Sequence, residues 1–247
     1  MSFRRFLGVV LFALAIPIVG TADVKIVEKQ HIDAFTMMGH TQPASDTRTV
    51  MWLGKGKMRV ETGKQVVIIR LDRKKMYIVE NNGAVYSVVN LPIDLKKMLP
   101  PGMGQQMLQM MKMTATVKKG TETKKIGKWN ARRWDITLSS TMAKVRQTWW
   151  VTQDLKLDLS DFNDMAAQLT ELQPGMKEAA EKFRQVDGFP VVKDTQTEMA
   201  MGGGAKMTSH EEVLSVEEGS PPAGTYEPPA GAKAKAFNLM EMMERKR

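Results

Sequence analysis

The stretch MGQQMLQMMKM, residues 103–113, has residue types that could do chemistry, because five of its eleven residues are methionine. Thioether sulfur is a soft ligand that binds Cu(I), and methionine side chains also adapt to irregular apolar partners. Met103, Met107, Met110 and Met111 follow the spacing of one helical face. Three uses stay open: core packing, a flexible lid over a hydrophobic cavity, and a copper site.

Tryptophans offer a second set of candidate binding residues. Trp134 alternates with Ile136 and Leu138 and so shares one strand face with them. The adjacent Trp149 and Trp150 must point to opposite faces of their strand, so at least one is expected to reach the concave side of the sheet. The predicted ligand-binding residues are therefore Met103, Met107, Met110, Met111, Trp134, Trp149 and Trp150.

Residues typical of catalysis or metal binding are few. The chain has no cysteine, and His31, His40 and His210 stand outside any HxH or HExxH motif. The aspartates that repeat every third position between 158 and 164 lack the glycine and closing glutamate of a calcium loop. The sequence thus predicts no enzyme, no catalytic residue, no metal and no cofactor.

The N-terminus has the order of a secretory signal peptide. Arg4 and Arg5 precede the apolar run 7–20, and the small residues 20–22 form a cleavage site before Asp23. The run is shorter than the roughly 20 residues that cross a bilayer. Residues 1–22 are predicted to be removed on export to the periplasm, which would leave a soluble chain without a lipid anchor or disulfide.

The charge of the chain is modestly basic. The 225 residues after the predicted cleavage carry 34 Lys and Arg against 27 Asp and Glu, a net charge of +7. The basic residues form no run of five or six, so nucleic acid is not an expected partner. An anionic membrane surface or an acidic envelope protein stays open as a partner.

Alternating patterns predict mainly strands. Residues 24–32 read as an opening strand, and a meander follows over 49–90 with a hairpin turn at Asn82-Gly83. Both faces of these strands are apolar, as Tyr77 and Ile78 illustrate, so the sheet needs two covers. Further strands are expected at 114–120, 129–138, 145–153, 188–201 and 206–218.

Helical spacing appears at 103–111, 162–172 and 176–183. The order of strands and helices predicts an α+β fold, in which a strongly curved antiparallel sheet forms a half-open β-barrel covered on one face by helices. We expect this domain to span residues 23–218. Residues 219–247 are rich in Pro, Gly and Ala and are expected to form a linker and a mobile C-terminal tail.

The segments 54–61, 124–136 and 148–155 resemble an uncharacterised bacterial secreted family, DUF4412-like, and more distantly the periplasmic lipoprotein carriers and sigma-factor regulators with an open β-barrel. The chain departs from the family pattern at Lys128, which replaces a glycine, and at Ala131, where some members have cysteine. The resemblance implies a curved antiparallel sheet around helices with a hydrophobic concavity. It implies no known activity.

These patterns lead to one expected function and two alternatives. The expected function is a non-enzymatic, methionine-rich periplasmic protein that binds a hydrophobic ligand in a half-barrel cavity, as carrier or sensor. The ligand would be an acyl chain, a lipid, a lipidated peptide or a lipidated protein. The alternatives are a Cu(I)-binding protein that uses the methionine segment and a structural envelope adaptor.

Overall fold

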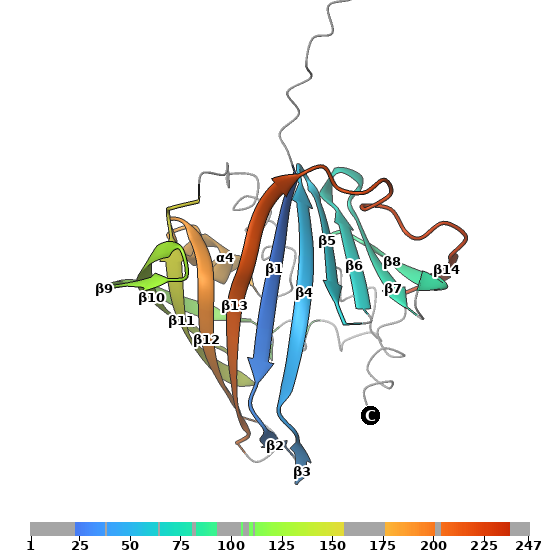
Figure 1. The fold of residues 1–247 in the computed structure, drawn as a ribbon. Coiled ribbons are helices and arrows are strands. Elements are labelled where there is room, and N and C mark those ends of the chain that lie inside the picture. Colours follow the sequence, from blue (N-terminus) through green and yellow to red (C-terminus); the bar gives the residue numbers. More distant parts are fainter. Residues whose placement is uncertain are drawn as a thin grey trace, which may run out of the picture.

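The computed structural model describes residues 23–37, 39–63, 65–80, 83–92, 105, 109–110, 112–155, 176–200 and 204–237. A twelve-stranded sheet dominates this part of the chain (Figure 1). From edge to edge the strands are β14 (Lys233–Ala236), β8 (Val85–Asn90), β7 (Lys75–Glu80), β6 (Gln65–Arg70), β5 (Lys57–Thr62), β4 (Ser45–Gly54), β1 (Asp23–Ile32), β13 (Lys206–Gly219), β12 (Phe189–Met199), β11 (Ala143–Thr152), β10 (Trp129–Ser139) and β9 (Thr114–Ile126).

Neighbouring strands are antiparallel except for β14, which runs parallel to β8. The short strands β2 (Phe35–Met37) and β3 (His40–Gln42) form a separate hairpin. A 3₁₀ turn, η1 (Leu71–Arg73), joins β6 to β7, and the helix α4 (Lys177–Phe183) precedes β12. The strands predicted from alternation are confirmed.

The predicted fold class is wrong in two respects, which are the helices expected to cover the sheet and the half-open barrel expected from its curvature. The described chain is nearly all-β, and β9 and β14 lie at opposite edges of one open sheet, not in a half-open barrel covered by helices. α4 has seven residues and is therefore roughly 10 Å long, enough to cross about two strand spacings of this wide sheet. The helix predicted at 162–172 lies outside the described residues, and that at 103–111 is described at Gln105, Gln109 and Met110, which are helical.

The strand register identifies which side chains share a face. Directly opposed residues of an antiparallel ladder lie on the same face. Trp134 opposes Trp149, Trp149 opposes Lys193, Lys193 opposes Glu211, and Glu211 opposes Gln30. α4 packs on this side, where Ala179 and Phe183 meet Ile136, Leu138 and Trp149. We call it the α4 face.

The opposite face of β5–β8 is covered by the C-terminal segment 220–232, which we call the strap. Tyr226 of the strap packs against the buried residues Ile68, Tyr77 and Val79. In Figure 1 the strap runs in orange-red from the end of β13 to β14. The composition of this segment predicts a linker, and in the structure its one tyrosine lies on an apolar cluster of the sheet.

Polar contacts fix the strap in place. The Tyr226 hydroxyl donates a hydrogen bond to Oδ2 of Asp23 at 2.6 Å. Arg70, 5% exposed, donates to both carboxylate oxygens of Asp72 and also binds the Tyr226 carbonyl and the Glu227 carboxylate. The bonds to Asp72 and Glu227 raise the pKa of Arg70 despite its burial. The strap is therefore tied to β1 and to β6.

The largest core cluster joins the two halves of the sheet. It brings Ile26 and Leu53 of the central strands together with Trp129, Trp150 and Phe189 of β10–β12.

Among the described helices, none has the length and apolar character needed to cross a bilayer.

Candidate functional site

The structure brings two of the predicted tryptophans together and separates the third. Trp134, 5% exposed, and Trp149 oppose each other on the α4 face. The ring of Phe183 stacks on Trp149 with centroids 5.6 Å apart. Trp150 belongs to a different core cluster, with Ile26, Leu53 and Phe189, and the Lys124 ammonium lies 3.8 Å from its ring centre. Trp134 and Trp149 are thus the aromatic residues of the α4 face at its β10–β11 end.

The methionine segment ends beside the same face. The Met110 carbonyl accepts a hydrogen bond from Oγ1 of Thr141 at 3.3 Å, and Met113 packs against the cluster of Ile136 and Leu138. These contacts place the C-terminal end of the methionine segment beside the cluster of Ile136, Leu138 and Ala179. The remaining predicted methionines, Met103, Met107 and Met111, lie outside the described residues.

One polar atom on the α4 face has no partner. The indole Nε1 of Trp149 is buried and makes no hydrogen bond among the described residues. A buried donor without an acceptor costs about 1–3 kcal/mol. Any acceptor that reached this indole would remove the cost.

A charged cluster continues the α4 face beyond the tryptophans. The Lys193 ammonium lies 2.7 Å from Oε2 of Glu211, and Gln30 donates to Oε1 of the same carboxylate at 3.0 Å. Burial raises the pKa of the neighbouring Glu28. The positive charge of Lys193 lowers this pKa, and the negative charge of Glu211 raises it further. Burial lowers the pKa of Lys193, but Glu28 and Glu211 outweigh it and raise that pKa. The described chain holds no group of three or more His, Cys, Asp or Glu placed for a metal ion.

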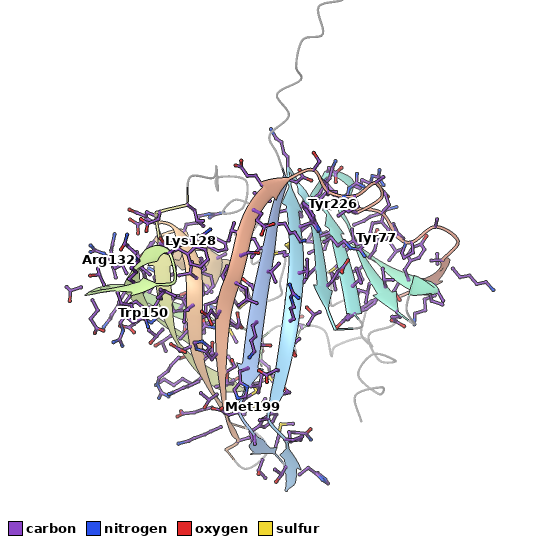
Figure 2. All side chains as sticks on the ribbon, in the orientation of Figure 1. Tyr77, Lys128, Arg132, Trp150, Met199 and Tyr226 are labelled. Atoms are coloured by element: carbon purple, nitrogen blue, oxygen red, sulfur yellow. The ribbon has the colours of Figure 1, made fainter. Side chains whose placement is uncertain are left out.

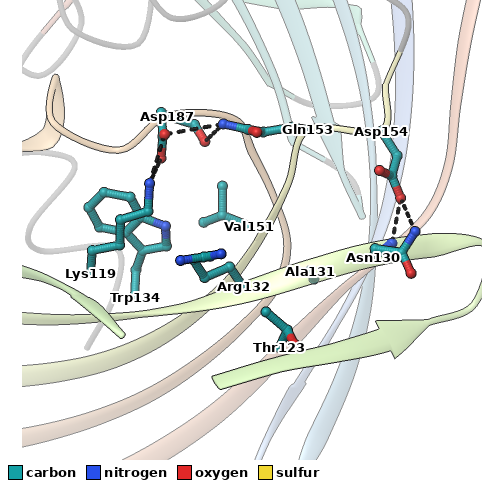
Figure 3. A pocket seen from close by; sticks show the side chains of 10 residues that line it. All are labelled: Lys119, Thr123, Asn130, Ala131, Arg132, Trp134, Val151, Gln153, Asp154 and Asp187. Atoms are coloured by element: carbon teal, nitrogen blue, oxygen red, sulfur yellow. Dashed lines mark hydrogen bonds and ion pairs between the residues drawn. The ribbon is translucent and has the colours of Figure 1, made fainter. Parts of the chain in front are cut away.

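A pocket of about 340 Å³ opens beside Trp134 (Figure 3). Its polar groups are largely paired with one another: Lys119 lies 2.9 Å from Asp187, which also accepts a hydrogen bond from Gln153. Arg132 has no ion-pair partner in the described part of the chain. The lining residues are Lys119, Thr123, Asn130, Ala131, Arg132, Trp134, Val151, Gln153, Asp154 and Asp187.

An apolar row crosses β5–β8 on the α4 face. Met58 opposes Ile69, Ile69 opposes Met76, and Met76 opposes Val89. A second row contains Val60, Val67 and Ile78. Ile69 and Val89 are buried, at 6% and 2% exposure, whereas the other apolar members of both rows are half-buried. The α4 face thus combines a broad apolar surface with an aromatic end.

Sequence reasoning missed the charged cluster. Glu28 lies on β1, far along the chain from Lys193 on β12 and Glu211 on β13, and the ladder register brings the three together. One local pattern in the sequence pointed to this cluster. Glu28 continues the alternation of Val24 and Ile26, so this acidic residue lies on the same face of β1 as the two apolar ones.

Comparison with known proteins identifies the family of the chain. No curated protein matches it. A solved structure, "Structure of PNGF-II in C2 space group", aligns over 90% of this chain and 32% of its own length, with 14% identity and a TM-score of 0.40. A family model matches residues 34–232, well over half of the chain. The chain therefore belongs to the family described as Domain of unknown function (DUF4412).

Proposed function

We propose that this protein is a non-enzymatic carrier that binds a hydrophobic chain, such as the acyl chain of a lipid, on the α4 face of its sheet. The observation that carries the proposal is the pair of apolar rows across β5–β8, whose members Met58, Val67, Met76 and Ile78 are half-buried. Covering the rest of their apolar surface would stabilise a complex by roughly 25 cal/mol for each Å² removed from water.

The shape and chemistry of the rows suit a flexible chain. The four strands β5–β8 span roughly 14 Å from the axis of the first to the axis of the last. Two rows that cross these strands form a long, narrow surface, which suits an extended chain better than a compact ligand. Met58 and Met76 contribute unbranched thioether side chains that adapt to an irregular or mobile apolar partner.

Export is part of the proposal. The order of Arg4, Arg5, the apolar run 7–20 and the small residues before Asp23 supports a cleaved signal peptide and a periplasmic location. Residues 1–22 lie outside the described residues.

A neutral fluorescent probe tests the binding function. N-phenyl-1-naphthylamine should bind saturably and be displaced by a fatty acid. Met76→Gln and Ile78→Gln should each weaken binding by about fivefold, because full burial of such a side chain contributes about 1.5–3 kcal/mol and the part left to cover contributes about 1 kcal/mol.

The matched control is Leu214→Gln. Leu214 is an apolar residue that is 51% exposed at the β13 bulge and lies outside both rows. Its replacement should leave probe binding unchanged. Equal losses in all three variants, or no saturable binding by the wild type, would contradict the proposal.

A further inference from the structure

Positive charge is concentrated at one edge of the sheet. The hairpin formed by β9 and β10, residues 114–139, contains seven Lys and Arg residues and two acidic residues, a net charge of +5 out of +9 for the whole chain. In the sequence these cations occur as short groups at 118–119, 124–125, 128 and 132–133. Pairing of β9 with β10 brings the groups together in one hairpin.

Most of these cations are available to a partner. Arg133 binds Asp135 and Glu122, and Lys119 binds Asp187. The other five are exposed and have no carboxylate partner in the described part of the chain: Lys118, Lys124, Lys125, Lys128 and Arg132. Figure 2 shows Lys128 and Arg132 on the same side of the molecule, that of the β9–β10 hairpin.

Protection of an edge strand explains only part of this charge. Lysines on an edge strand block pairing with another sheet. The opposite edge, β14, carries two, Lys233 and Lys235. Lys128 lies in the turn, and Arg132 lies on β10, which is paired on both sides, so neither residue protects an edge.

We propose that the β9–β10 hairpin docks on an anionic lipid bilayer. Consecutive lysines such as Lys124 and Lys125 point to opposite faces of the edge strand, so the hairpin presents cations around its rim and not along one groove. A bilayer offers phosphates in a plane that such a rim can contact in any register.

Nucleic acid fits the hairpin less well. Trp129, Trp134 and Trp150 are at most 8% exposed, and the hairpin therefore has no free tryptophan ring on which bases could stack. The inference does not depend on the proposed acyl-chain function, because it concerns the charges of the hairpin alone.

Vesicle sedimentation tests the docking. The full-length protein is mixed, at low salt, with vesicles of equal parts phosphatidylglycerol and phosphatidylcholine, and with vesicles of phosphatidylcholine alone. Lys118, Lys125 and Lys128 are then changed together to Gln. Each lysine near an anionic bilayer contributes roughly fivefold in binding, so this variant should lose about a hundredfold of the phosphatidylglycerol-dependent affinity.

A control variant with the same change in net charge makes the test specific. Lys55, Lys75 and Lys233 are exposed and lie outside the hairpin, and their joint replacement by Gln should leave the affinity within about fivefold of wild type. Absence of phosphatidylglycerol-dependent binding, equal losses in the two variants, or equally tight binding of a DNA duplex at the same salt would each overturn the proposal.

Discussion

Substitution of Tyr226 measures how strongly the strap holds the sheet. Tyr226→Phe keeps the ring on Ile68 and Tyr77 but removes the hydrogen bond to Asp23. A hydrogen bond to a charged group contributes about 1.5–3 kcal/mol, and water can replace part of it because Asp23 is half-buried, so we expect a loss of about 1 kcal/mol. For a chain of this size that loss lowers the Tm by about 2–4 °C.

Tyr226→Ala also removes the ring. A fully buried aromatic side chain contributes about 3–5 kcal/mol relative to alanine, and half of that for the half-buried Tyr226 adds about 2 kcal/mol. The total of about 3 kcal/mol lowers the Tm by about 6–12 °C. Thermal unfolding followed by circular dichroism gives both values, with Tyr86→Phe as control, because the Tyr86 hydroxyl has no hydrogen-bond partner among the described residues. If both Tyr226 variants melted with the wild type, the strap would not be a stabilising cover.

Two further predictions concern the polar cluster and a backbone position. Burial raises the pKa of Glu28, so the contribution of this group to stability is present at low pH and is lost as the pH rises through the folded pKa. Glu28→Gln should therefore gain stability relative to wild type as the pH rises above the ordinary glutamate pKa of about 4.3, and a difference in urea unfolding that stays constant with pH would refute this. A Cβ at Gly188, where φ is +125°, would lie 2.4 Å from the Thr152 carbonyl oxygen, so Gly188→Ala should cost more than about 3 kcal/mol, whereas Gly219→Ala, with no atom within 4 Å, should change the urea midpoint little.

The strands can be predicted because each carries its own alternating pattern. The alternation predicts that Tyr77 and Ile78 point to opposite faces, and the structure places Tyr77 under the strap and Ile78 on the α4 face. The same pattern requires two covers for the sheet. It contains no information about what the covers are, because the position of Tyr226 on Ile68 depends on contacts between segments far apart in the chain.

The open form of the sheet and the clustering of positive charge on the β9–β10 hairpin could not be predicted from the sequence, for the same reason. Whether the two edge strands of a sheet pair with each other depends on the geometry of the whole sheet, and β9 and β14 remain at separate edges. The basic groups are dispersed along the sequence, since Lys118 and Arg132 are well separated in it, yet the β9–β10 ladder makes them parts of one hairpin. Local patterns therefore locate the elements, and the strand register assembles the candidate surfaces.

Native mass spectrometry tests the central claim, that the α4 face binds an apolar chain, most directly. Protein purified without detergent, or incubated with a fatty acid, should carry one adduct with the mass of the acyl ligand. The adduct should be lost in Ile78→Gln and retained in Leu214→Gln. A wild-type protein that carries no adduct under either condition, or an adduct equally retained in Ile78→Gln, would contradict the account.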